Sequence, residues 1–315
     1  MVTRSDNLPA ENVSRGGDGY HIPVLLKETI EGLNIQPSGT YVDCTFGGGG
    51  HSRAILEHLD EHGVLVAFDQ DSDAAANLPD DPRIVFIPQN FRHIGRFLKL
   101  KNISGVHGIL ADLGVSSHQF NEPARGFSTR FDANLDMRMN SRQSKTAAEI
   151  LNTYSEQRLH RMFEQFGEVT NSKTLARTIV AARTSSPFTT IAQFQQVLHS
   201  IVKGNPNKYF AQVFQALRIE VNEEFEALKE LLEQVPQLLL PGGRIAVITF
   251  HSGEDRIVKN FFKQGSFEDV EEDVFGRKEK SPFKIITKKP VTAGDKEVKQ
   301  NSRSRSAKLR VAEKI

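Results

Sequence analysis

The residues of this chain whose types and spacing could bind a ligand or take part in a reaction lie at the ends of apolar runs. Gly47 to Gly50 are four consecutive glycines, and Asp69 lies 22 residues beyond Gly47. Glycines let a backbone adopt positive φ and bring its N–H groups close to a ligand. A carboxylate at this spacing can accept hydrogen bonds from ribose hydroxyls. Asp112 and His251 follow two further apolar runs, where they could contact a reacting group. The pattern indicates a nucleotide-like cofactor beside a reaction centre.

A strand before the glycines, and a helix and a strand after them, must position this loop. The run 41–44 predicts the end of a buried strand, 52–59 a one-sided apolar helix, and 63–68 a second buried strand. This order is typical of a nucleotide-binding half. The simpler alternative is a glycine-rich turn with a solvated Asp69 at the next strand end. Ser52 stands where a dinucleotide motif has its third glycine. Adenosine with a short amino-acid tail, as in S-adenosylmethionine, therefore fits at least as well as a dinucleotide.

Strands alternate with helices in the rest of the first and last parts of the chain. Apolar runs at 83–88, 106–112 and 244–250 predict further strands, and 283–287 with 308–312 predict a closing antiparallel pair. This alternation predicts an α/β fold: a doubly wound, mostly parallel Rossmann-like sheet.

The middle of the chain interrupts that pattern, because 121–205 contains no convincing strand. We expect a disordered tail at 1–19, an α/β domain built from 20–120 and 206–315, and an all-helical substrate-recognition insert at 121–205. Helix signals in and after the insert are capping boxes at Thr146/Glu149 and Thr190/Gln193, helices at 155–167 and 172–183, and a long helix at 212–233.

Composition narrows the class of protein. The 315 residues carry a formal net charge of +1, so a basic surface must come from local clustering. One cysteine, Cys44, excludes an internal disulfide framework and is expected in the core. The histidines are scattered, so no metal is expected. Neither a bilayer-spanning run nor a secretory segment is evident, which predicts a cytoplasmic protein without membrane contact. The basic residues of the last part, either a nucleic-acid contact or a solvated face, are Arg277, Lys278, Lys280, Lys288, Lys289, Arg303 and Arg305.

Several motifs taken together resemble the ribosomal RNA small subunit methyltransferase H family. They lie in order between about residues 20 and 312, and they are HIPVL at 21–25, DCTFGGGGHS at 43–52, ADLGVSS at 111–117, RGFS at 125–128, LDMRM at 135–139, FQALRI at 214–219 and TFHS at 249–252. The resemblance implies a bacterial enzyme that uses S-adenosylmethionine to methylate the exocyclic N4 of one cytidine in the decoding region of 16S ribosomal RNA. It also implies small-subunit RNA as partner, in an assembled or nearly assembled 30S particle, and a possible homodimer.

The resemblance also assigns site residues. It implies cofactor contacts at Gly49, Gly50, His51, Asp69, Phe91, Asp112 and Gln119. Asp112 and His251 are the candidate catalytic residues. Alternatives remain for each: Phe91 as a core aromatic, Asp112 as an anchor for the cofactor's amino group or a helix N-terminus, and the segment after residue 250 as a helix cap with Ser252 at N-cap. The chain departs from the family pattern at His118 and Gly253, neither of which replaces a polar contact.

Other functions remain possible at this stage. A DNA amino-methyltransferase is disfavoured because Asp112 is followed by Leu113-Gly114-Val115 rather than a Pro-Pro-aromatic turn. A non-catalytic ribosome assembly factor could keep the fold and bind cofactor only for stability. A nicotinamide oxidoreductase is weakened by Ser52.

Overall fold

The computed structural model describes residues 23–268 and 280–315, so the predicted tail at 1–19 and the basic residues Arg277 and Lys278 lie outside it. Within the described residues one seven-stranded sheet has the order β3-β2-β1-β4-β5-β7-β6. The five neighbouring strands β3, β2, β1, β4 and β5 are parallel to one another, and β7 pairs antiparallel with β5 and β6. The predicted doubly wound sheet and its closing pair are confirmed. The strands are β1 (Thr40–Asp43), β2 (Val64–Phe68), β3 (Ile84–Ile87), β4 (Val106–Asp112), β5 (Leu239–Thr249), β6 (Phe283–Ile285) and β7 (Lys308–Lys314).

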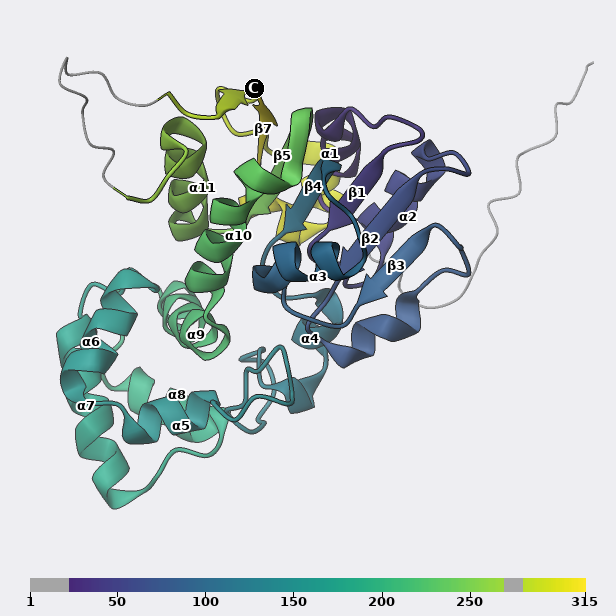
Figure 1. Ribbon diagram of the computed structural model, residues 1–315. Helices are drawn as coiled ribbons and strands as arrows, with labels where there is room; N and C mark the ends of the chain where they lie inside the picture. The colour runs from purple at the N-terminus through teal and green to yellow at the C-terminus, as the bar shows by residue number, and fades with distance from the viewer. Residues whose placement is uncertain (1–22, 269–279) are drawn as a thin grey trace, which may run out of the picture.

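Helices cover both faces of the sheet and form a second group beside it (Figure 1). The α-helices are α1 (Leu26–Leu33), α2 (Gly50–His58), α3 (Ile94–Leu100), α4 (Ser117–Asn121), α5 (Ala147–Thr153), α6 (Glu156–Gln165), α7 (Ser172–Ser185), α8 (Ile191–His199), α9 (Pro206–Asn222), α10 (Glu224–Leu238), α11 (Ser252–Gln264) and α12 (Asp295–Gln300). Short 3₁₀ turns are η1 (Ser72–Asn77), η2 (Phe91–His93), η3 (Pro123–Arg125) and η4 (Ser302–Ser306).

The sheet separates two hydrophobic cores because successive strand residues point to opposite faces. On β4, Ile109 belongs to the core under α3, α10 and α11, whereas its neighbour Leu110 belongs to the core under α1 and α2. Both residues are fully buried. Burial on both faces explains why these strands are nearly continuous apolar runs in the sequence.

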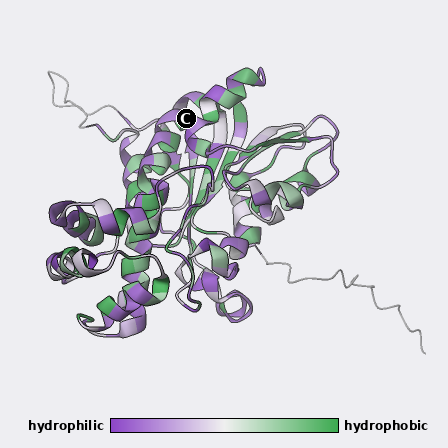
Figure 2. Cartoon of the chain, turned by 90° about the horizontal axis from the view of Figure 1, so that it is seen from below, coloured by the Kyte–Doolittle hydropathy of each residue, from purple (hydrophilic) through white to green (hydrophobic). Residues whose placement is uncertain are grey.

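A third core holds the helical unit, residues 121–205, together. It joins apolar residues of α5 to α8 with one face of α9, including Tyr209, Phe214 and Leu217. These helices lie beside the sheet domain in Figure 1, and most present both hydrophilic and hydrophobic residues in Figure 2. Thr190 and Gln193 form the predicted capping box. Hydrophobic contact therefore continues beyond residue 205 into α9, which leads back to the sheet.

Two elements differ from the sequence prediction. The predicted long helix at 212–233 is two helices, α9 and α10, separated by Glu223 with φ of 51°. Strand β5 is longer than predicted, because it passes through Pro241-Gly242-Gly243 before the apolar run at 244–249. Its pairing with β4 is irregular between Val106 and Gly108, and a bulge of this kind tolerates proline in a strand.

Candidate functional site

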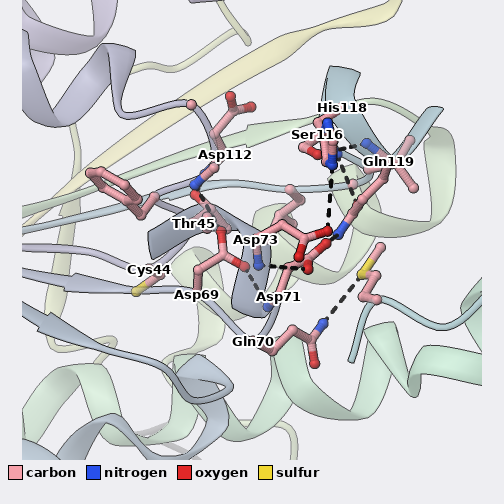
Figure 3. Close-up of a pocket in the computed structure, with 18 of the residues that line it drawn as sticks. Cys44, Thr45, Asp69, Gln70, Asp71, Asp73, Asp112, Ser116, His118 and Gln119 are labelled. Atoms are coloured by element: carbon pink, nitrogen blue, oxygen red, sulfur yellow. Dashed lines mark hydrogen bonds and ion pairs between the residues drawn. The ribbon is translucent and has the colours of Figure 1, made fainter. Parts of the chain in front are cut away.

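A cavity of about 1110 Å³, the main cavity, opens at the carboxyl ends of the parallel strands. Its lining includes Gly47 after β1, Asp69 after β2, Asp112 at the end of β4 and Phe250 after β5. Doubly wound sheets bind ligands at this edge. Figure 3 shows how Asp69, Asp112 and Gln119 lie around part of this cavity.

The glycine loop is tied directly to Asp69. The Gly47 N–H donates to Asp69 Oδ2 over 2.7 Å, and the Asp71 N–H donates to Oδ1 over 2.8 Å. Burial, opposed by these two hydrogen bonds, raises the pKa of Asp69 to about 6. The 22-residue spacing read from the sequence therefore corresponds to a contact. A carboxylate oxygen has more than one lone pair, so Asp69 can also accept from a ligand's hydroxyls.

The glycines make room for a ligand in different ways. A Cβ on Gly48 would meet nothing within 4 Å, so its backbone faces open space. Gly49 has φ of 75° and is the residue before α2, but it is not among the residues that line the main cavity. A Cβ on Gly50 would lie 2.3 Å from Pro23 Cγ, so Gly50 also permits close packing. Gly48 is therefore the glycine of the loop that has free space beside its backbone, where a ligand can approach.

His51 and Asp112 face one another across the main cavity wall. His51 Nε2 lies 3.0 Å from the Val24 carbonyl oxygen, which only accepts, so Nε2 carries a hydrogen. His51 Nδ1 lies 3.7 Å from Asp112 Oδ2. Burial raises the pKa of Asp112 to about 6, against the opposing charges of His51 and Arg303. Asp112 Oδ1 is buried and has no hydrogen-bond partner among the described residues.

The remaining predicted cofactor contacts, Phe91 and Gln119, both line the main cavity. Phe91 begins η2 and is partly exposed, so its ring is available to a ligand. Gln119 is buried, and its amide donates to Asp71 Oδ2 over 2.7 Å. Arg125, from the start of the helical unit, pairs with the same Asp71 oxygen at 2.9 Å. Gln119 therefore links the cavity wall to the RGFS motif.

His251 is placed differently, because it does not line the main cavity. It is the N-cap of α11, and its Nδ1 accepts from the Glu254 N–H, so the prediction of Ser252 at this position is wrong. The Ser252 hydroxyl instead donates to Glu168 of the helical unit over 2.8 Å. The unusual Gly253 also has a reason here: a Cβ would lie 2.5 Å from the Phe225 ring. His251 thus positions the turn after β5.

Several lining residues were missed by sequence reasoning because they are remote from the glycine loop. Glu224 forms a partly buried ion pair with Arg218 at 2.8 Å, and Glu254 Oε2 accepts from the Phe250 N–H over 2.8 Å. Arg303, from η4, lines the cavity and donates to the Val115 carbonyl. Only the basic C-terminal run hinted at Arg303, and nothing in the sequence joined the two glutamates to Asp112.

The described residues hold neither a cluster of metal ligands nor a membrane-spanning helix. No three His, Cys, Asp or Glu side chains within residues 23–268 and 280–315 gather as metal ligands would. In the same part of the chain, no helix combines the length and apolar character needed to cross a membrane.

Comparison with known proteins gives one consistent family. A model of the MraW methylase family matches residues 18–315. The ribosomal RNA small subunit methyltransferase H of Cytophaga hutchinsonii is 54% identical over 299 residues, which cover 94% of this chain and 99% of that protein. The protein of the same name from Azobacteroides pseudotrichonymphae is 55% identical over 298 residues, which cover 94% of this chain and 98% of that protein. That from Flavobacterium johnsoniae is 53% identical over 297 residues, again covering 94% and 98%.

Proposed function

The chain belongs to the MraW methylase family of S-adenosylmethionine-dependent methyltransferases, and we propose that it methylates the exocyclic N4 of one cytidine in the decoding region of bacterial 16S ribosomal RNA. Similarity to small-subunit rRNA methyltransferases over 94% of the chain supports the substrate class. The cytosine N4 is the finer part of the proposal, and it rests on Asp112.

The observation that carries this proposal is the buried, unpartnered Oδ1 of Asp112. A buried acceptor without a donor is costly, so it suits a site whose donor arrives with a ligand. The cytosine amine supplies such N–H donors. The lone pair of this amine is delocalised into the ring, which makes the nitrogen a poor nucleophile. An acceptor that binds the amine hydrogens helps the nitrogen to rehybridise and stabilises the positive charge that develops on it.

The main cavity fits S-adenosylmethionine by three features: its volume, the open backbone of Gly48, and an acidic residue at the ribose position. Asp69 would accept the ribose hydroxyls and Phe91 would stack on adenine. The backbone at Gly48 and Gly50, which both line the cavity, would approach the amino-acid tail, with His51 and Gln119 beside it. A contact from Gly49 stays a prediction, because Gly49 does not line the cavity and its N–H donates to the Phe46 carbonyl oxygen. When bound, the cofactor supplies a methyl group on a sulfonium for in-line transfer.

Asp112 also accepts the proton that N4 loses when it is methylated. A carboxylate with a pKa of about 6 binds a proton more strongly than one with the ordinary value of 3.8. Asp112 Oδ1 can therefore hold the amine N–H first and receive its proton afterwards. His51 Nδ1 lies 3.7 Å from Oδ2, so the imidazole stands beside the carboxylate that receives the proton. His251, outside the cavity lining, acts in this scheme by positioning the turn that carries Phe250.

The proposed partner is the small ribosomal subunit, assembled or nearly so, which the helical unit and the basic C-terminal residues would contact. The target base must leave its stack to reach the cavity, which favours an unpaired or distorted RNA segment. With such a substrate, a cytoplasmic location is part of the proposal. The homodimer stays a prediction that the single chain does not test.

The test is to incubate the protein with small subunits from a strain lacking this methyltransferase and with methyl-labelled S-adenosylmethionine, and to analyse the nucleosides by mass spectrometry. We expect label only in N4-methylcytidine at one position, and a rate that falls steeply with salt at subsaturating subunits because phosphate contacts dominate binding. Label in another nucleoside would refute the base assignment. Equal methylation of naked duplex DNA would refute the ribosomal assignment, and cofactor binding without label would favour an assembly factor.

A further inference from the structure

A second, smaller cavity adjoins the main cavity on the far side of the turn that follows Asp112. This side cavity has a volume of about 200 Å³. Five of the eight residues that line it also line the main cavity, namely Leu113, Gly114, Val115, Phe250 and Arg303. The shared residues begin directly after Asp112, which lines the main cavity but not the side cavity.

The side cavity has the dimensions and walls of a site for one flat ring. Pockets for whole drug-sized molecules occupy roughly 300–1,000 Å³, so this one suits a heterocycle without its sugar. Leu113 and Val115 supply apolar surface, and Phe250 supplies an aromatic wall. A Cβ on Gly114 would lie 3.7 Å from Phe250 Cδ2, so the ring faces the turn after Asp112 closely.

The carboxylate of Asp112 and the guanidinium of Arg303 favour the hydrogen-bonding edge of cytosine over that of uracil. Two arginines line the side cavity: Arg218, which forms an ion pair with Glu224, and Arg303, which also lines the main cavity and puts a cation beside the ring site. Cytosine presents an N–H donor at N4 and acceptors at N3 and O2, which match a carboxylate next to a cation. Uracil presents an acceptor at position 4 and a donor at N3, which oppose both charges. The two charges therefore select the pyrimidine that carries an amine.

We propose that the side cavity receives the flipped target base, with the Phe250 ring stacked on it and Arg303 facing its acceptor edge, while Asp112 holds its amine at the boundary with the main cavity. This rests on the proposed function, because it supplies the base site for that reaction. Enzymes that act on a flipped base commonly hold it between aromatic and apolar side chains. Phe250 is thus a residue that contacts the substrate base, whereas Asp112 and Arg303 distinguish cytosine from uracil.

The experiment compares Phe250→Leu with Phe250→Tyr. Leucine keeps apolar packing but loses the π-face, whereas tyrosine keeps the ring. Single-turnover methylation of small subunits is measured at saturating subunits and S-adenosylmethionine, and cofactor affinity is measured by calorimetry. We expect Phe250→Leu to be slower by roughly five- to 100-fold, the range for losing one base stack, with unchanged cofactor affinity and with Phe250→Tyr close to wild type. Phe97→Leu is the matched control, because Phe97 lines neither cavity and packs, partly buried, against the core under α3, α10 and α11, so its rate and cofactor affinity should stay close to wild type.

Each outcome decides between the base site and its alternatives. If Phe250 only packs the fold, Leu should be at least as good as Tyr in rate and in unfolding free energy, and the base site is refuted. Weaker cofactor binding in Phe250→Leu would assign the ring to the cofactor instead. If the wild-type protein labels no small-subunit RNA, the proposed function itself fails, which separates that failure from failure of the base site.

Discussion

Asp112→Asn should make the protein more stable and less active at the same time. Raising the pKa of Asp112 from 3.8 to about 6 means that ionising this side chain costs the folded state about 3 kcal/mol more than it costs the unfolded chain. The side chain is 25% exposed, so solvent screening reduces the figure to about 1–3 kcal/mol. Asparagine keeps the shape without the charge and should recover that free energy at neutral pH.

The sign of the effect fixes its pH window. For an acid whose pKa is raised on folding, the cost of the charge is absent below the unfolded value of 3.8 and complete above about 6. The stability advantage of Asp112→Asn should therefore be full at pH 7.5 and shrink as the pH falls from about 6 towards 4. Urea unfolding of both proteins at pH 7.5 and 4.5 measures it.

Asp136→Asn is the matched control with the opposite sign. Burial raises the pKa of Asp136, but hydrogen bonds from Arg138 outweigh it and leave the pKa below its ordinary value. Removing that charge should cost stability at pH 7.5. If Asp112→Asn is no more stable than wild type at pH 7.5, or keeps the same advantage at pH 4.5, the argument from the buried charge is refuted.

The same Asp112→Asn variant separates catalysis from cofactor binding. If Asp112 supports the developing charge on N4, the single-turnover rate should stay depressed by roughly ten- to a thousandfold at saturating S-adenosylmethionine and RNA, the range for losing one electrostatic contact. Recovery of the wild-type rate would reduce Asp112 to a binding residue.

Two further predictions concern the cofactor. Asp69→Ala should weaken S-adenosylmethionine binding by about 1.5–3 kcal/mol in calorimetry, with circular dichroism unchanged, because hydrogen bonds to a charged group are lost; an unchanged affinity would remove Asp69 from the site. Wild-type affinity should also fall as the pH drops below about 6, where Asp69 takes up a proton, and Asp69→Asn should flatten that profile. Gly48→Ala should fold normally but bind cofactor weakly, whereas Gly50→Ala should lower the unfolding free energy because its Cβ would lie 2.3 Å from Pro23 Cγ. Equal behaviour of the two alanine variants would contradict this reading of the loop.

Local pattern predicted the sheet because its strands are buried on both faces and therefore read as apolar runs. Prediction from local pattern failed where a contact with a residue distant in the sequence determines the backbone conformation. Glu223 breaks the helix at 212–233 with a positive φ, although no glycine or proline announces a turn there. Its side chain pairs with Arg92 at 2.8 Å and Lys145 at 3.0 Å, contacts that no local window contains.

The candidate site divides in the same way. Its glycine loop and Asp69 were predictable because they lie on neighbouring strands of one βαβ unit, where spacing fixes contact. Glu254 and Arg303 come from elements more than 130 residues after Asp112, and only the folded sheet brings them to the same cavity. The misassigned helix cap has a similar cause, since Ser252 is the better N-cap by type but its hydroxyl donates to Glu168.

The helical unit is inserted in the chain next to the main cavity, which is why we propose that it recognises the substrate. The chain leaves the sheet just after Asp112, and Gln119 on the outgoing side still lines the main cavity. It returns through α9 and α10, where Asn222 and Glu224 line the same cavity. Asn222 also accepts from the Met139 N–H over 2.7 Å, which ties the two sides together. If the helical unit binds the RNA, as proposed, both of its connections to the sheet domain carry residues that line the same cavity as Asp112.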